Sequence, residues 1–381
     1  MSEMDAAAAC VPALPEDVVS EILARVPDVV SLFRCAAVCH LWRRLVADPA
    51  FLRRYRLWPA GCGTSLLGFF AQRHQLSVNA RRKVSKLFPS RAPVLVPAPG
   101  SALGPGRRFL SSFVRDDAGI LDQAKPVAAR GGLLLVRVSH RPRDKITVLS
   151  LCVCDLLAGK RDLPPLDVAP FGDEGVRGYA VLTAADHGAG HHRPADGYST
   201  FFQVLLTGVD HEDGRAFILK FSSAAAASRS WSCIQGSLAG PYGSRVAAVT
   251  RGTARAELLP LDMLPRIMRV DRSNVWLCLS TDERLSLIYL HNNHLWILTK
   301  KDGDLGGTGN WMCTRAVQVG VELGLFGMES LSMVSVGEKS GTVLALYHSD
   351  PDNAYSFNYM TAVAYEINWL EFFMSRLGVR Q

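Results

Sequence analysis

The chain has 381 residues and a formal net charge of +7, with 48% hydrophobic and 20% charged residues. This is ordinary globular composition, at a length that suits one large domain and a small one, so we expect a sizeable core. No apolar run approaches the roughly 18 residues of a membrane-crossing helix, which excludes that class of protein.

Cysteine usage points to a reducing compartment. The nine cysteines form an odd set without a CxxC spacing, so we expect buried reduced thiols rather than a disulfide framework or a zinc site. Cys152 and Cys154 should share one face of a strand. The N-terminal segment carries acidic residues and lacks the basic stretch of a secretory signal. We therefore expect a protein of the cytoplasm, the nucleus or both.

Residues 14–55 predict three short helices. Pro15-Glu16-Asp17 suits a helix start, and apolar residues then recur at helical spacing as far as Pro27. A second helix is expected from Ser31, which can cap it, and a third should carry Trp42 and end at Asp48-Pro49. A unit this small rarely supplies its own core, so its surplus apolar face needs cover from the rest of the chain or from a partner.

The same stretch resembles an F-box. The resemblance rests on residues that stand in that family's order and spacing, namely Leu14-Pro15, Glu21-Ile22-Leu23, Arg25-Val26-Pro27, Val38-Cys39 and Trp42-Arg43. Two positions depart from the pattern: His40 replaces the usual Lys or Arg, and Val26 stands where Leu is commoner. Neither change removes an apolar anchor. The alternative is an ordinary three-helix cap packed on its own domain.

The resemblance implies a partner. In that family the F-box docks on a small Skp-type adaptor, which links it to a cullin scaffold and a ubiquitin-conjugating enzyme. The residues that the resemblance assigns to adaptor contact, or to its direct support, are Leu14, Pro15, Ile22, Leu23, Val26, Leu32, Val38 and Trp42.

The positive charge is unevenly distributed. From Arg34 to Arg91 there are 12 basic residues against one acid, Asp48, so the basic excess belongs to the helical region and the segment after it. Nucleic-acid binding would need basic and aromatic residues converging on one folded surface, and we do not expect it. A solvated face or an acidic protein partner explains the excess better, although Arg81-Arg82-Lys83 could also form a weak nuclear localisation patch.

Short β-like runs occupy the rest of the chain. The segment 66–70 predicts a first buried strand, and the Pro- and Gly-rich segment 89–106 an exposed loop. The further strands are expected at 133–138, 146–155, 178–183, 201–207, 215–221, 231–234, 245–250, 275–280, 285–290, 294–299, 311–319, 331–336, 342–347 and 359–365. An amphipathic helix is expected at 367–377.

These predicted strands are too many for one β-sandwich. Small sheets repeated around a central axis accommodate them and leave only short exposed strand edges. The predicted fold class is α+β multidomain, a small three-helix F-box followed by a large all-β domain that forms a β-propeller of six or seven blades. The domains expected are an F-box at 10–56, a basic transition with the first strand at 57–108, and the β domain with its closing helix at 109–381. No WD dipeptide or periodic motif marks the blades.

A second resemblance concerns the β domain. Segments 65–70, 132–135 and 152–155, the last followed by Leu163-Pro164-Pro165, look like the F-box-associated region of plant F-box proteins, grasses especially. Residues 201–204, with Trp231 after an Ala/Ser loop, are similar to the next blade. The resemblance extends to about residue 235 and names no substrate. It departs at 156–158, where the family often has Pro-Leu-Thr.

No catalytic constellation stands out. The sequence has neither a phosphate-binding P-loop nor a GxSxG nucleophile elbow, so we expect no enzyme activity and no cofactor. His187, His191, His192 and His211 suit a solvated loop better than a metal site. Tryptophans 231, 276, 296 and 311 suit the core better than a ligand cage.

The resulting hypothesis is a substrate-receptor subunit of a Skp–cullin–F-box ubiquitin ligase. The F-box would bind the adaptor, and the β domain would bind a target protein that the sequence does not identify. Two alternatives remain: a ligand- or glycan-binding β domain, which a thermal-shift screen would reveal, and an F-box protein acting outside a ligase, which would bind adaptor without needing cullin.

Overall fold

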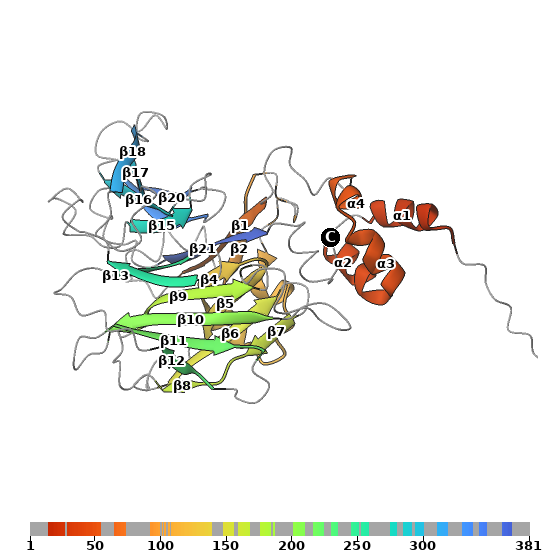
Figure 1. Ribbon diagram of the computed structural model, residues 1–381, viewed down its shortest axis with the longest axis horizontal. Helices are drawn as coiled ribbons and strands as arrows, with labels where there is room; N and C mark the ends of the chain where they lie inside the picture. The colour runs from red at the N-terminus through yellow and green to blue at the C-terminus, as the bar shows by residue number, and fades with distance from the viewer. Residues whose placement is uncertain are drawn as a thin grey trace, which may run out of the picture.

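A computed structural model of the chain places helices at one end and β-sheets throughout the rest (Figure 1). It describes residues 14–26, 29–54, 65–73, 92–99, 101, 103, 106, 108–138, 148–155, 159–167, 176–183, 186, 201–209, 216–224, 230–234, 245–250, 253–258, 275–279, 285–291, 294–300, 311–318, 330–337, 343–348 and 360–367. None of the described helices is long and apolar enough to cross a membrane.

The helical end contains one helix more than expected. The helices are α1 (Glu16–Ala24), α2 (Val29–Val38), α3 (His40–Val46) and α4 (Pro49–Arg54). The second begins before Ser31, so that residue does not cap it. Asp48-Pro49 starts a helix rather than ending the region, because the Asp48 carboxylate accepts a hydrogen bond from Ala50 N at 2.8 Å and proline suits the first helical position.

The first and last strands share a sheet. Strand β1 (Ser65–Arg73) lies between β2 (Val94–Pro97) and β21 (Met360–Ile367), and β3 (Arg108–Phe109) forms the outer edge. Residues about 290 positions apart are therefore paired, as Ser65 is with Ile367. Strand β2 lies inside the segment expected to be an exposed loop, and that expectation is wrong because Val94 and Leu95 are buried.

The remaining strands follow the chain in antiparallel meanders. The second sheet contains β4 (Lys125–Arg130), β5 (Leu133–Val138), β6 (Val148–Asp155), β7 (Gly159–Asp162) and β8 (Leu166–Asp167). The third contains β9 (Val176–Thr183), β10 (Phe202–Val209), β11 (Ala216–Ser222) and β12 (Ser232–Ile234). Two 3-10 turns, η1 (Leu110–Ser112) and η2 (Ile120–Gln123), join the first sheet to the second.

Three further sheets follow along the described part of the chain. They are the pair β13 (Arg245–Thr250) and β14 (Thr253–Leu258), the sheet of β15 (Val275–Leu279), β16 (Leu285–His291), β17 (His294–Lys300) and β18 (Trp311–Gln318), and the pair β19 (Ser330–Val336) and β20 (Val343–His348). Every strand predicted between residues 133 and 365 is present, with ends shifted by a few residues, whereas β2, β3, β4, β7, β8 and β14 were not predicted. The helix expected at 367–377 lies outside the described residues apart from Ile367, which belongs to β21.

Neighbouring sheets touch mainly through one strand of each, which is β21 in the sheet of β1 and the first strand of the meander in most others. Strand β4 contacts both β21 and β9, β9 contacts β13, and β19 contacts β15, β16 and β21. Across two of these junctions the ends of the strands are linked: the Tyr365 hydroxyl donates to Gly132 O at 2.6 Å, and Arg130 binds Asp186, which follows β9. Neighbouring sheets thus pack side by side, mainly through these strands.

The buried apolar side chains form two main clusters. One runs from the helices into the first two sheets, with Leu32 and Leu52 at the helical end and Phe70, Leu134 and Tyr365 among the strands. The other fills the space between the second and third sheets. The helices therefore do not form a core of their own, in agreement with the expectation that a unit this small needs cover from the rest of the chain or from a partner.

Candidate functional site

Helix α1 carries apolar side chains on two faces, one of them buried and the other exposed. Val19 and Leu23 are buried, with 5% and 1% of their surface exposed. Leu14, Val18 and Ile22 are 57%, 39% and 50% exposed; Val18 and Ile22 share one face of the helix, and Leu14 lies just before the helix begins. We call these last three residues the apolar stripe. Single exposed apolar residues are common, but two on one face of a nine-residue helix, with a third just before it, are typical of a docking surface.

A further exposed apolar residue lies where α2 meets α3. Val38, the last residue of α2, is 69% exposed. Cys39 follows and caps α3, because its Sγ accepts a hydrogen bond from Trp42 N at 3.5 Å. Trp42 and Val26 are half-buried and pack against the core cluster. The junction therefore holds its tryptophan partly inside the bundle and leaves the valine exposed.

The residues assigned to the adaptor by resemblance fall into three groups. Leu14, Pro15, Ile22 and Val38 are exposed, Val26 and Trp42 are half-buried, and Leu23 and Leu32 are buried. Only the first two groups are accessible to a partner, so Leu23 and Leu32 can act only by supporting the helices. Val18 was not among the assigned residues, although its spacing of four from Leu14 and Ile22 was a signal in the sequence.

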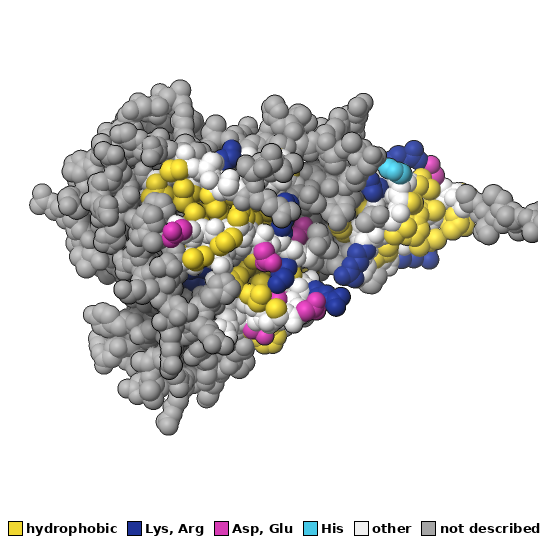
Figure 2. Space-filling view, turned by 90° about the horizontal axis from the view of Figure 1, so that it is seen from below, with side chains coloured by type: hydrophobic (Ala, Val, Ile, Leu, Met, Phe, Trp, Pro, Cys, Tyr) yellow, Lys and Arg dark blue, Asp and Glu magenta, His cyan; other side chains and the backbone are white. Residues whose placement is uncertain are grey.

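Charged pairs hold α1 against the helices behind it. Arg44 of α3 binds Glu16, and Arg54 of α4 binds Glu21. All four side chains are largely exposed, so each pair contributes only about 0.2–1 kcal/mol. Figure 2 shows hydrophobic side chains gathered on the helical end with Lys and Arg side chains around them. The helical end therefore presents apolar side chains among charged ones.

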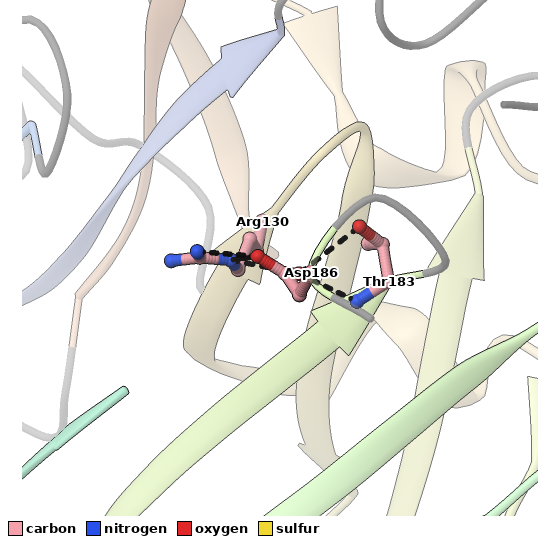
Figure 3. A network of polar contacts seen from close by, with 3 residues as sticks. All are labelled: Arg130, Thr183 and Asp186. Atoms are coloured by element: carbon pink, nitrogen blue, oxygen red, sulfur yellow. Dashed lines mark hydrogen bonds and ion pairs between the residues drawn. The ribbon is translucent and has the colours of Figure 1, made fainter. Parts of the chain in front are cut away.

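A polar network between two sheets of the β region is structural. Arg130, at the end of β4, binds the Asp186 carboxylate through Nε at 2.9 Å and Nη2 at 2.5 Å, and Thr183 donates to the same carboxylate from its backbone N at 2.8 Å and its hydroxyl at 3.1 Å (Figure 3). Burial alone would raise the pKa of Asp186, but the bonds and charge of Arg130, followed by the bonds from Thr183, lower it. The network joins the second sheet to the third and leaves no reactive group unpaired.

A second ion pair supports the junction between the first two sheets. Lys160 Nζ binds Asp116 at 3.0 Å, and the Asp116 side chain is 1% exposed. The hydrogen bond from Lys160 to Asp116 raises the pKa of the lysine. Beside it, Cys152 and Cys154 are free and buried with their sulfur atoms 3.9 Å apart, as expected from their spacing. The hydrogen bond to Cys152, followed by burial, raises the pKa of Cys154 well above its usual value, so this thiol is not a nucleophile.

Among the described residues, the other candidate sites form neither a ligand cage nor a metal site. Trp231 donates from Nε1 to Pro164 O at 2.9 Å and packs on Phe221, so it belongs to the core. The histidines at 187, 191, 192 and 211 lie outside the described residues. No group of three His, Cys, Asp or Glu side chains among the described residues could hold a metal ion.

Comparison with known proteins identifies the helical end. Residues 11–57 match the family model described as F-box-like. No curated protein matches the chain significantly. Among solved structures, the chain is similar to a puromycin hydrolase variant in complex with the ligand PGG, with 14% identity and a TM-score of 0.31, over 59% of this chain. That similarity spans only 35% of the hydrolase chain.

The match covers all four helices and the whole apolar stripe. The chain therefore carries an F-box-like domain at residues 11–57, followed by a region built mostly of β-sheets.

Proposed function

We propose that this protein is a substrate-receptor subunit of a Skp–cullin–F-box ubiquitin ligase. The observation that carries the proposal is the apolar stripe on α1 of the F-box-like domain. A Skp-type adaptor would cover the stripe together with Pro15 and Val38, which are also exposed. Burying the remaining surface of Leu14 or Ile22 stabilises such a complex by about 1 kcal/mol per side chain.

We further propose that the β region is a six-bladed propeller of the plant F-box-associated type that binds the target. Three observations support this: the described strands form six sheets, several neighbouring sheets contact one another through an edge strand of each, and β21 completes the sheet begun by β1. Pairing the last strand with the first closes a ring of blades and ties the two ends of the domain together. The domain boundaries we propose are 10–56, 57–108 and 109–381.

The mechanism follows from position rather than from reactive groups. The F-box would fix the chain to the ligase through the adaptor and cullin, and the β domain would hold a target protein near the charged ubiquitin-conjugating enzyme. Such a receptor accelerates transfer by raising the effective concentration of the target, and it needs no active site of its own. The protein would act in the cytoplasm or the nucleus, where the ligase acts.

Co-expression with a plant Skp-type adaptor, followed by size-exclusion chromatography, tests the proposal. The native chain should elute with the adaptor as a stoichiometric complex. The double variant Leu14→Ala with Pro15→Ala should elute alone with its β domain folded, because both residues are exposed and neither supports the core. A double variant that still co-elutes in full would remove the basis for this docking surface.

A further inference from the structure

Strands β21, β4 and β9 of three neighbouring sheets run in the same direction. The ends of β21 and β4 meet where Tyr365 binds Gly132, and the ends of β4 and β9 meet where Arg130 binds Asp186. Strand β1 begins opposite Ile367, the last residue of β21. In Figure 1 the arrow of β9 points toward the helices and that of β10 points away. The beginnings of β21, β4 and β9 therefore face away from the F-box.

Two cations and a tyrosine gather on the side where these strands begin. Lys125 is the first residue of β4 and lies directly opposite Arg137 on β5, so both side chains project from the same face of the sheet. Tyr179 of β9 lies near Arg137; against the effect of burial, which raises the pKa of the tyrosine, the charge and hydrogen bonding of Arg137 act to lower it. Lys125, Arg137 and Tyr179 are all half-buried, which leaves each of them accessible to solvent. We call these three residues the cationic cluster.

The cluster lacks a counter-charge among the described residues. Arg130 and Lys160, which are also partly buried, are each neutralised by a carboxylate. No described carboxylate forms an ion pair with Lys125 or Arg137. Burial, followed by the positive charge of Arg137, lowers the pKa of Lys125. Holding two like charges side by side therefore destabilises the fold, and such destabilising arrangements are kept where they serve binding.

The tyrosine adds a hydrogen-bond donor. Burial raises the pKa of Tyr179, so its hydroxyl keeps its proton at neutral pH. A protonated tyrosine hydroxyl is a hydrogen-bond donor, so it can donate to an oxygen of a ligand. The cluster thus offers an ammonium, a guanidinium and a hydroxyl donor, which is the donor set that phosphate and carboxylate groups prefer.

A second observation lies at the same end of the neighbouring strands. Gln72 of β1 and Thr361 of β21 are opposite each other in the sheet, and β21 contacts β4. Gln72 Oε1 and Thr361 Oγ1 are buried without a hydrogen-bond partner, and Gln72 is only 6% exposed. Unsatisfied buried polar atoms are rare in proteins, and two of them facing each other give this end of the sheet unused hydrogen-bonding capacity.

We propose that Lys125, Arg137 and Tyr179 form an oxyanion-binding site on the side of the β domain that faces away from the F-box. Its ligand is a phosphate or carboxylate group carried by a target protein. The inference that a target protein carries this group rests on the proposed function. A receptor fixed to its ligase by the helices would use the opposite side of the β domain to recognise its target. The site itself stands on the arrangement of the three side chains.

Titration of the native full-length chain with sodium phosphate at constant ionic strength, followed by its thermal unfolding midpoint, tests the site. A ligand bound only by the folded state raises the midpoint, and we expect a saturable rise of about 1–3 °C. The rise should vanish in Lys125→Met and in Arg137→Met and persist in Lys220→Met, which changes a half-buried lysine on β11 outside the cluster. No rise in the native chain, or an equal rise in Lys125→Met, would overturn the inference.

The ligand-free proteins provide an independent readout. Lys125→Met should have an unchanged or higher midpoint than the native chain, because it removes an unneutralised charge beside Arg137. A midpoint several degrees lower would mean that Lys125 supports the fold, and the inference would fail. Tyr179→Phe keeps the ring and removes the hydroxyl, so it should weaken the phosphate response several-fold without abolishing it.

Sodium glutarate in the same titration distinguishes a carboxylate ligand from a phosphate ligand. Saturable binding of either anion supports the site, and the tighter one names the group on the target. No adaptor is present in these measurements, so their outcome is separate from that of the co-elution experiment. Anion binding without adaptor binding would support the oxyanion site and contradict the ligase role. Adaptor binding without anion binding would support the ligase role and overturn the oxyanion site.

Discussion

Neighbouring residues on α1 separate partner binding from folding. Ile22 is 50% exposed and belongs to the apolar stripe, whereas Leu23 is 1% exposed and belongs to the core. One step along a helix turns the side chain by about 100°, which is enough to move it from solvent into the bundle. The two positions therefore form a matched pair for testing the docking surface.

We expect Ile22→Ala to weaken adaptor binding about 5- to 10-fold while changing the free energy of unfolding by less than about 0.5 kcal/mol. Leu23→Ala should instead lower the free energy of unfolding by about 2–4 kcal/mol, because it leaves a cavity in the core. Calorimetric titration of the adaptor and chemical denaturation measure the two effects. Equal destabilisation by both substitutions would argue against an exposed Ile22.

The buried pair of Arg130 and Asp186 makes a second prediction at this scale. Their side chains are 11% and 9% exposed, and Asp186→Asn would remove the carboxylate that neutralises the buried arginine, at a loss of about 3–5 kcal/mol in the free energy of unfolding. The exposed pair of Arg115 and Asp117 supplies the control, since Asp117→Asn should lose less than about 1 kcal/mol. Comparable losses from the two variants in chemical denaturation would contradict the structural role of the network.

The same carboxylate gives the native protein a characteristic pH dependence. The pKa of Asp186 in the folded chain is lowered from its ordinary value of 3.8, so the folded state binds its proton less readily than the unfolded state does. The stability that the pair contributes is fully present above the unfolded-state value and is lost as pH falls through the lower folded-state value. Asp186→Asn should therefore lose less stability than the native chain over that acid range.

At the scale of elements, the sheet that contains β1, β2 and β21 depends on one glycine. Gly68 of β1 has a φ of +152°, and a Cβ added there would lie 2.3 Å from Val96 O on β2. The position also marks a bulge in the pairing of β1 with β21. Glycine is therefore required both by the backbone conformation and by the close approach of β2.

We expect Gly68→Ala to lower the free energy of unfolding by at least about 2 kcal/mol, because β1 and β2 must move apart. Gly106→Ala is the control, since nothing lies within 4 Å of a Cβ added at that residue. Thermal unfolding of both variants measures the difference. If Gly68→Ala unfolded at the same temperature as Gly106→Ala, the close pairing of β1 with β2 would be wrong.

The sequence predicted most elements, and each element it missed has a physical reason. Strand β4 contains Pro126, which argues against a strand, but the pairing with β5 shifts register between Pro126 and Ala128 and so accommodates the proline. Strand β2 is short and flanked by prolines, so its segment resembled a loop. Helix α4 was missed because Asp48-Pro49 can end one helix and begin another.

The candidate sites were predictable to different degrees. The exposed residues Leu14, Pro15, Ile22 and Val38 stand in the F-box pattern and could be named from it. The burial of Leu23 could not, because periodicity shows that a helix has an apolar face without showing which neighbour covers it. The cationic cluster was not predictable either, since it depends on the register between β4 and β5 and on the placement of β9.

At the scale of the molecule, the two proposed surfaces lie on opposite sides. The apolar stripe belongs to helices at one end, and the cationic cluster lies where β21, β4 and β9 begin, away from those helices. One core cluster runs from the helices into the first two sheets, so the F-box-like domain is joined to the β region by more than a linker. A receptor of the kind we propose would therefore hold its target at a set distance from the ligase.

Affinity for the adaptor tests the central claim most directly. Calorimetric titration of a Skp-type adaptor into the native chain and into Ile22→Asp, which places a charge in the apolar stripe, is the measurement. The account predicts saturable one-to-one binding to the native chain, at least about 100-fold weaker binding to the variant, and the same unfolding midpoint for both. Equal affinity for the two chains, or no binding to the native chain, would contradict it.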